Sequence, residues 1–228
     1  MNVAFFQQIE EILHTERIDS YRQDGADEAL TLSRYTLNMA LSESLYPVLQ
    51  FAEIALRNVV HKAMTARCQT DTWYDHANAR LLGWQNQKVA EAKISLQQNG
   101  KQITPGRIVA ELNFGFWTGF FNLGHGQTGV GYYLARRAFP HAPAADQDFH
   151  KLGQRWKKIR DLRNRVFHHE RVIHWNDLDA RHQAILEIID WMSPELNDLA
   201  VVLDRFSLIK NAGLAPWLAK LQHHWPQP

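Results

Sequence analysis

The chain has 228 residues, of which 45% are hydrophobic and eight are tryptophan. This length and composition allow a substantial hydrophobic core and exclude a disordered chain. The formal net charge is only +1, which excludes a uniformly basic protein that binds nucleic acid without selectivity. We therefore expect any nucleic-acid site to be a local patch.

The composition also bears on redox chemistry and on location. Cys68 is the single cysteine, so no disulfide forms within the chain and no thiolate zinc site is expected. Residues 1–14 lack a basic leader with a long apolar segment, and no stretch approaches the roughly 18 apolar residues of a membrane span. We expect a cytoplasmic protein with no membrane partner.

The first third of the chain has the spacing of α-helices, and no alternation with period two predicts a strand. A first helix is expected over residues 2–14 and a second over about 26–43. The segment Ser44–Pro47 predicts a helix restart, which leads into an apolar helix to about Ala66.

The middle third begins with a connection over residues 67–85, followed by a polar helix that ends at Asn99-Gly100. Thr104-Pro105 predicts a helix start, with threonine as the cap and proline at the first helical position. This helix is expected to contain the aromatic segment 114–121. The glycine-rich stretch 123–131 is expected to be a loop, because it lacks the lysine and the preceding strand of a phosphate-binding P-loop.

In the last third, residues 141–146 separate a short helix from a long basic one. Asn176-Asp177 and Ser193-Pro194 predict the starts of two more helices, the second of which closes at Asn211–Gly213. A short terminal helix is expected after Ala215.

The predicted fold class is therefore all-α. We expect a single domain over residues 1–228, with residues 1–25 as a candidate N-terminal helical extension. No internal repeat or low-complexity linker divides the chain.

The most distinctive segment is Arg163–Glu170, RNRVFHHE, at the end of the predicted basic helix. Histidine exchanges protons near neutral pH, and arginine holds a phosphate through a two-pronged guanidinium. Metal-free cleavage of an RNA backbone requires these residue types. On an ideal helix Asn164 and His168 share a face, whereas Arg163 and His168 lie about 140° apart around the axis. Arg163 and His168 would thus flank a site from two sides, unless the helix end unwinds or a second subunit completes the site.

A second group of the same residue types lies about a hundred residues earlier and consists of Glu53, Arg57, Asn58 and His61. Glu53, Arg57 and His61 are spaced four apart and form one stripe on a helix. The stripe has two interpretations. Glu53 and Arg57 form an ion pair that braces the helix, or the stripe faces residues 163–170 and orients them.

The basic run 155–171 is a candidate RNA-binding surface. Its expected RNA contacts are Arg155, Lys158, Arg160, Arg165 and Arg171. A solvated helix face with no ligand is the alternative, and it is the commoner cause of a charge run. The aromatic segment 114–121 could stack bases, although core packing is the commoner role at helical spacing.

Twelve histidines raise the question of a metal, but no HExxH motif and no Cys/His spacing set occurs. His168, His169 and Glu170 are adjacent in sequence, so on a helix their side chains point in different directions and cannot grip one ion together. We expect no metal and no cofactor.

Five segments in the order LRNVVH, TPGRIVAELNFGFW, AFPH, LRNRVFHHE and WMSPEL resemble the Abi-like family of bacterial phage-defence (abortive infection) proteins. That family belongs to the HEPN superfamily. The resemblance runs from about residue 30 to 195 and is strongest at residues 105–117 and 162–170. It implies a HEPN-like helical bundle, here with additional helices at the N- and C-termini, and a homodimer in which two copies of a motif face one another across a cleft.

The motif of HEPN ribonucleases is Arg, a polar residue and, three to five positions later, His. Arg163, Asn164 and His168 match it, and His169 satisfies a spacing longer by one. The resemblance implies an endoribonuclease that cuts RNA without metal, the ribose 2′-hydroxyl attacking the adjacent phosphate. It casts His168 as the acid/base group, Arg163 as the phosphate clamp and Asn164 as an orienting residue, with His169 and Arg165 in secondary roles. An antitoxin or a phage-derived activator is a further partner that such a protein would have.

Two other functions remain open from the residues. A noncatalytic RNA-binding or regulatory module would use the same basic helix and bind RNA with a steep salt dependence but no cleavage. A structural interaction protein would dock a protein partner on its aromatic helices.

Overall fold

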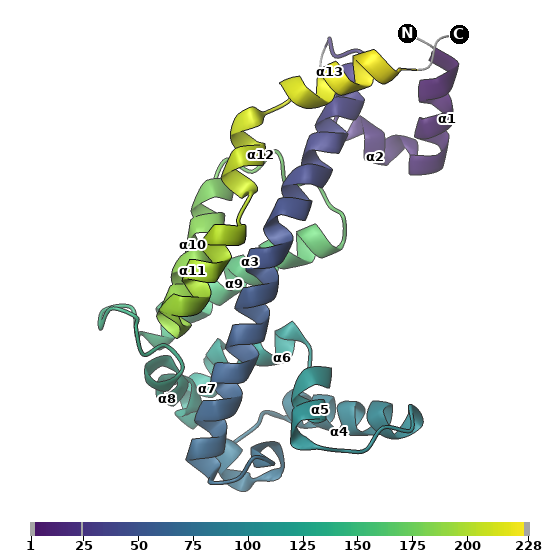
Figure 1. The fold of residues 1–228 in the computed structure, drawn as a ribbon. Coiled ribbons are helices and arrows are strands. Elements are labelled where there is room, and N and C mark those ends of the chain that lie inside the picture. The colour runs from purple at the N-terminus through teal and green to yellow at the C-terminus, as the bar shows by residue number, and fades with distance from the viewer. Residues whose placement is uncertain (1–2, 24, 226–228) are drawn as a thin grey trace. The chain divides into compact units, whose positions relative to one another are not determined.

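The computed structural model describes residues 3–23 and 25–225, and within them the chain forms helices and no strand (Figure 1). The predicted all-α fold class is thereby confirmed. The elements are α1 (Val3–Leu13), α2 (Thr15–Asp19), α3 (Glu28–Cys68), η1 (Trp73–Asp75), η2 (Ala77–Ala79), α4 (Gly83–Gln98), α5 (Pro105–Glu111), α6 (Phe114–Thr118), η3 (Gly119–Phe121), α7 (Leu123–Thr128), α8 (Val130–Arg137), α9 (Phe149–Phe167), α10 (Leu178–Met192), α11 (Pro194–Leu203), α12 (Phe206–Ala212) and α13 (Ala215–His224). No helix of the described residues is long and apolar enough to cross a membrane.

The chain divides into two compact units, each assembled from separate segments. The first unit comprises the described residues of 1–47, 164–182 and 203–228, and the second comprises 48–163 and 183–202. The boundaries fall inside α3, α9, α10 and α11, so each of these helices contributes residues to both units. The prediction of one domain over the whole chain stays a prediction.

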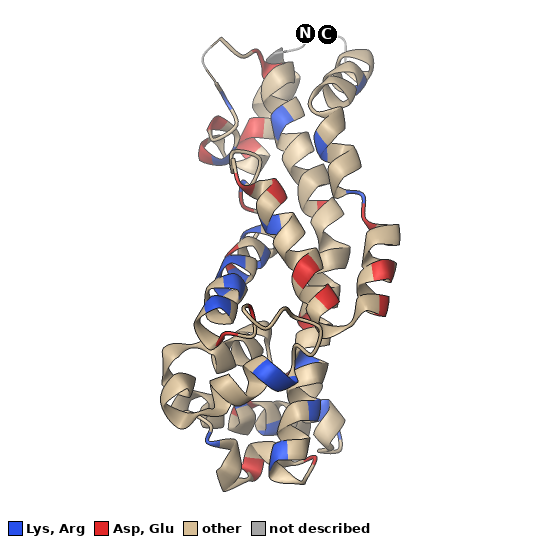
Figure 2. Cartoon of the chain, turned by 90° about the vertical axis from the view of Figure 1, so that its left-hand side faces the viewer, with Lys and Arg blue, Asp and Glu red and all other residues tan. Residues whose placement is uncertain are grey.

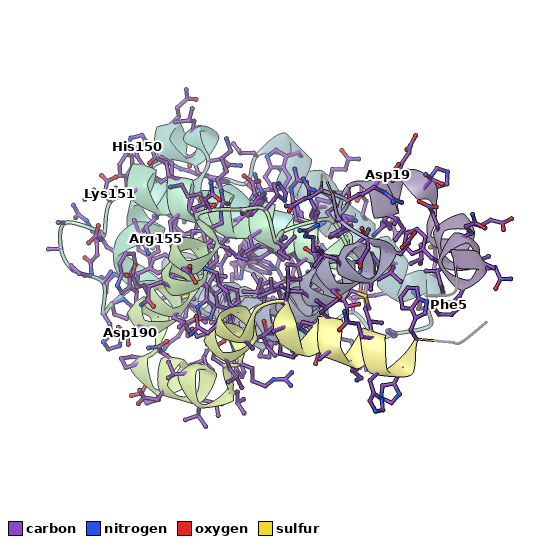
Figure 3. The ribbon with its side chains drawn as sticks, turned by 90° about the horizontal axis from the view of Figure 1, so that it is seen from above. Phe5, Asp19, His150, Lys151, Arg155 and Asp190 are labelled. Atoms are coloured by element: carbon purple, nitrogen blue, oxygen red, sulfur yellow. The ribbon has the colours of Figure 1, made fainter. Side chains whose placement is uncertain are left out.

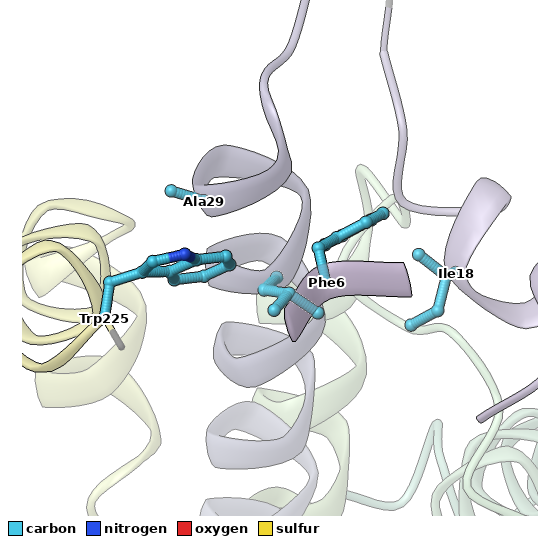
Figure 4. Packing of buried hydrophobic residues seen from close by; sticks show 5 residues of the cluster. Phe6, Ile18, Ala29 and Trp225 are labelled. Atoms are coloured by element: carbon cyan, nitrogen blue, oxygen red, sulfur yellow. The ribbon is translucent and has the colours of Figure 1, made fainter. Parts of the chain in front are cut away.

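An apolar cluster at the N-terminal end of α3 forms part of the core of the first unit (Figure 4). Phe6 of α1, Ile18 of α2, Ala29 of α3 and Trp225 are buried together in it. The Phe5 ring meets Trp225 edge to face, with centroids 5.2 Å apart, a favoured aromatic geometry. Phe5, Phe6 and Ile18, from helices α1 and α2, therefore pack in this core, whereas Ile12 of α1 is exposed. The predicted N-terminal extension stays a prediction.

Aromatic side chains fill the core of the second unit. The ring centroid of Trp73 lies 6.3 Å from that of Trp117 and 6.0 Å from that of Phe120. The centroids of Phe116 and Trp117 are 5.0 Å apart, and all three pairs are T-shaped. These rings are buried, and Trp117 Nε1 donates to the Leu112 carbonyl oxygen at 3.1 Å. The aromatic segment 114–121 thus has the core role that was the alternative to base stacking.

Several predicted boundaries are confirmed by their capping groups. The hydroxyl of Thr104 accepts a hydrogen bond from the Arg107 N–H, so α5 begins at Pro105 as expected. Helix α4 ends at Gln98, and Gly100 follows with φ +63°, a left-handed conformation that favours glycine. The connection at 141–146 before α9, the starts of α10 and α11, and a terminal helix after Leu214 are also present.

The predicted restart at Ser44–Pro47 is wrong, because α3 runs unbroken for 41 residues with Pro47 inside it. Proline in a helix interior removes a hydrogen bond and costs about 3 kcal/mol or more. Leu45, Val48 and Leu49 around it are all buried, and each contributes roughly 1.5–3 kcal/mol when it leaves water. Burial therefore outweighs the defect.

Three further predictions are wrong. Helix α5 ends at Glu111, because Asn113 caps a new helix by accepting from the Phe116 N–H. The stretch 123–131 is not a loop but α7 and the start of α8, separated by Gly129 with φ +73°. Asn211–Gly213 closes α12 rather than the helix that Ser193-Pro194 opens, since α11 already ends at Leu203.

Candidate functional site

The C-terminal end of α9, in the first unit, carries the histidines of the predicted motif. The helix closes with three backbone hydrogen bonds: the N–H of His168 donates to Asn164 O (2.9 Å), that of His169 to Val166 O (3.2 Å) and that of Glu170 to Arg165 O (2.8 Å). The last two form the paired bonds of a Schellman motif, in which a left-handed residue ends the helix. Helix α9 itself ends at Phe167, and His168, His169 and Glu170 form the turn that follows it.

His169 takes the left-handed position of this motif, with φ +57°. Glycine is the usual residue there, because a side chain costs roughly 1–2 kcal/mol in left-handed backbone. A histidine with strained backbone at such a position is a reason to consider a functional role. His168 and His169 are both exposed, so their imidazoles are accessible to a ligand.

The segment directly after α9 is fastened to the first unit by side chains that are distant in sequence. Arg17 Nη1 of α2 donates to the His169 carbonyl oxygen at 2.8 Å, and Arg171 Nη1 donates to the Ser20 carbonyl oxygen. On the other side, Tyr46 of α3 stacks on Phe167 with ring centroids 4.7 Å apart. These contacts hold the histidine-bearing turn in one conformation.

Asn38 of α3 is the central anchor of this segment. Only 3% of it is exposed, its Nδ2 donates to Glu170 O at 3.3 Å, and its Oδ1 accepts from the N–H groups of Val172 (2.7 Å) and Ile173 (3.1 Å). Sequence reasoning missed Asn38 and Arg17. The signal for Asn38 is a buried-looking amide in the apolar stretch of α3, but its partners lie more than 130 residues away.

Arg163, the predicted phosphate clamp, belongs to the second unit. Its Nε donates to Glu53 Oε2 at 3.3 Å, and the two side chains are 26% and 28% exposed. This ion pair links one residue of each group that the sequence singled out, both within the second unit. It orients the Arg163 guanidinium and offsets part of its charge. Among the described residues no ion pair joins Glu53 to Arg57.

The other members of the group Glu53, Arg57, Asn58 and His61 have different surroundings. His61 Nδ1 accepts from Trp73 Nε1 at 2.8 Å, and burial lowers the pKa of His61, so the ring is neutral and supports the aromatic core. Arg57 Nε is buried with no hydrogen-bond partner among the described residues. Asn58 is exposed. The structure therefore brings Glu53 to the motif but directs His61 to Trp73.

The arginines of the predicted RNA surface already have partners inside the protein. Arg155, which is labelled in Figure 3, donates from Nη1 to Glu187 at 2.6 Å. Its guanidinium lies 4.3 Å from the centroid of the Trp191 ring. Arg165 Nη1 donates to Glu170 at 2.6 Å, and Arg160 donates to the Thr118 hydroxyl at 3.4 Å. Lys158 is exposed on the same helix, whose basic residues appear blue in Figure 2.

The predicted motif thus crosses the boundary between the units along the chain. Arg163 lies in the second unit, and Asn164, His168, His169 and Glu170 lie in the first. In residues 3–23 and 25–225, no group of three or more His, Cys, Asp or Glu side chains is arranged to hold a metal ion.

No family model matches the chain, and comparisons with curated proteins and with solved structures return no match.

Proposed function

We propose that the chain is a metal-independent endoribonuclease of the abortive-infection or toxin type and a member of the Abi-like family of the HEPN superfamily. The proposal rests on the Arg163-Asn164-x3-His168 motif. The observation that carries it is the braced helix end, which presents His168 and His169 to solvent while His169 holds a backbone conformation unfavourable for a side chain.

The reaction assigned to these residues is an internal transesterification. A base removes the proton from the ribose 2′-hydroxyl, the 2′-oxygen forms a bond to the adjacent phosphorus, and the bond from phosphorus to the 5′-oxygen breaks. An acid protonates the leaving 5′-oxygen, and the products carry a 2′,3′-cyclic phosphate and a 5′-hydroxyl. In this scheme His168 moves the protons and Arg163 offsets the charge that develops on the phosphoryl oxygens.

The other residues support these two. Glu53 positions the guanidinium of Arg163, Asn164 orients the scissile phosphate, and Glu170 holds Arg165 beside the helix end. RNA is the substrate, and a homodimer would bring two motifs to one cleft.

A noncatalytic RNA-binding or regulatory module is the second candidate. The observation that favours it is the engagement of Arg163 with Glu53 and of Arg165 with Glu170, because a guanidinium already paired with a carboxylate is a weaker clamp for a phosphate. Such a module would bind RNA with a salt-dependent affinity and leave it intact.

The test is a cleavage assay on labelled transfer and messenger RNA in excess chelator. Wild type is compared with Arg163→Ala, His168→Ala, His169→Ala and the control His223→Ala, an exposed histidine near the C-terminus outside the motif. We expect wild type and His223→Ala to leave 2′,3′-cyclic phosphate ends. His168→Ala is expected to cleave roughly 100-fold or more slowly than wild type, as expected when an acid/base group is removed.

The remaining outcomes separate the candidates. RNA binding without products from wild type, at every protein concentration, supports the regulatory module. Equal cleavage by wild type, Arg163→Ala and His168→Ala contradicts the site assignment. A larger loss in His169→Ala than in His168→Ala identifies His169 as the working histidine.

A further inference from the structure

A pocket of about 390 Å³ opens within the first unit, in the size range of small-molecule sites. Its polar wall includes Arg34 of α3, Tyr21, and Arg171 and His174 from the segment after α9. Leu214, which precedes α13, contributes an apolar part of the lining. Neither the cleavage proposal nor the sequence patterns account for this pocket.

The pocket is cationic, because two arginines and no aspartate or glutamate occur among its described lining residues. Arg34 forms no ion pair with any residue that the structure describes, and its Nη1 atom is buried with no hydrogen-bond acceptor there. A partly buried guanidinium without a counter-charge is costly to the fold. An anion in the pocket would supply the missing charge.

Hydrogen bonds hold the backbone on which Arg171 lies. The N–H groups of the next two residues, Val172 and Ile173, both donate to Asn38 Oδ1, and Arg171 itself donates to the Ser20 carbonyl oxygen. The backbone that carries this arginine is therefore fixed before any ligand arrives, which lowers the entropic cost of binding.

No other group in the pocket opposes an anion. Burial raises the pKa of Tyr21 to about 12, so at neutral pH its phenol is uncharged and can donate a hydrogen bond. Burial, reinforced by the charges of Arg171 and Arg165, lowers the pKa of His174. The lining thus presents two fixed positive charges and a neutral donor.

We propose that this pocket binds a phosphoryl group, held by Arg34 and Arg171, with the rest of the ligand against the apolar lining. Two guanidinium groups suit an anion with several oxygen acceptors, since each can bind two of them. The site goes beyond the proposed cleavage function, because neither His168 nor Asn164 lines the pocket. The phosphoryl group can belong to a mononucleotide or to an RNA backbone.

Calorimetric titration of the full chain separates these two sources. The probes are inorganic phosphate, adenosine 5′-monophosphate, adenosine, and a 2′-O-methyl RNA oligonucleotide that cannot undergo transesterification. They are titrated into wild type, Arg34→Gln, Leu214→Glu and the control Lys220→Gln, which removes one positive charge from the same unit without touching the pocket. Circular dichroism verifies that each variant is folded.

We expect wild type and Lys220→Gln to bind the monophosphate with a Kd below about 1 mM and to bind adenosine far more weakly. Arg34→Gln should weaken binding by roughly tenfold or more, as expected when a charge-assisted hydrogen bond is lost. Leu214→Glu should do the same by repulsion, which keeps the test decisive if Arg34→Gln does not fold. The same losses for the oligonucleotide alone would show that the phosphoryl group comes from RNA.

Unchanged affinity for every probe in a folded variant would overturn the proposal, and so would the absence of any phosphate binding by wild type. Neither result depends on catalysis. Conversely, monophosphate binding by a wild-type protein that cleaves no RNA would support the pocket and count against the nuclease.

Discussion

His125 of α7 is a buried histidine that the second unit holds in its neutral form. Its Nε2 lies 2.5 Å from Gln85 Oε1, and its ring packs on Phe120 with centroids 4.8 Å apart. Burial lowers the pKa of His125 from the ordinary 6.5 to about 4. Gln85 Oε1 can only accept, so the ring carries its proton on Nε2 and is uncharged at neutral pH.

This histidine makes stability depend on pH in a defined direction. Below pH 6.5 the unfolded chain takes up a proton at His125 and the folded chain does not, so stability is complete above pH 6.5 and falls as the pH drops toward 4. The shift corresponds to a loss of up to roughly 3 kcal/mol. Urea unfolding at pH 7.5 and 4.5 measures it. His125→Gln should show a smaller difference between the two pH values, and an equal difference would contradict the assignment.

His169 at the end of α9 allows a stability test of the proposed site. His169→Gly removes the side chain from left-handed backbone and should raise the free energy of unfolding by about 1 kcal/mol. His169→Ala keeps a Cβ in that conformation and should give no such gain. Urea unfolding of both variants checks this. If the position is under functional selection, the more stable glycine variant should also cleave or bind RNA less well than wild type.

In helix α3, the burial of apolar side chains outweighs a local signal for a helix break. Pro47 is a helix-breaking signal by local rules, yet buried leucine and valine side chains on both sides keep the helix continuous. The glycines of 123–131 are a second case of the same kind, because they predict a loop although α7 and the start of α8 form there. Caps were predictable, as Thr104 and Gly100 show, since a cap acts within four residues.

Pro47→Ala should therefore stabilise the chain. Alanine restores the N–H that can donate to the carbonyl of Glu43 and removes the clash of the ring, so we expect a gain of about 1–3 kcal/mol in urea unfolding. The matched control is Pro105→Ala at the first position of α5, where no helical hydrogen bond is missing. That variant should change stability little. Equal effects of the two substitutions would contradict the explanation.

Across the whole chain, the fold class was predictable, whereas the contacts made by residues of the predicted motif were not. Helical periodicity is a local property, and it identifies an all-α protein without any knowledge of packing. The partners of Arg163 and Glu170, by contrast, are distant in sequence. Glu53 lies 110 residues before Arg163, and Asn38 lies 132 residues before Glu170. A single sequence contains no signal that pairs residues at such separations.

The proposed homodimer offers the sharpest test of the proposed function. In the proposed dimer, the arginine and the histidine that act on one phosphate would come from different subunits. A mixed dimer of Arg163→Ala and His168→Ala chains still carries one Arg163 and one His168, on opposite subunits. We expect it to regain up to about half of the wild-type cleavage rate, although each variant alone cleaves far more slowly than wild type.

Two different affinity tags and sequential purification isolate the mixed dimer, and sedimentation measures its mass. A dimer of two wild-type chains, each carrying one of the two tags, controls for the effect of the tags. If each subunit used its own arginine and histidine, both sites of the mixed dimer would carry a defect, and it would stay as inactive as its parents. A monomeric protein would yield no doubly tagged species at all. Regained activity therefore requires both a dimer and a cleft built from two copies of the motif, because neither condition alone can restore cleavage.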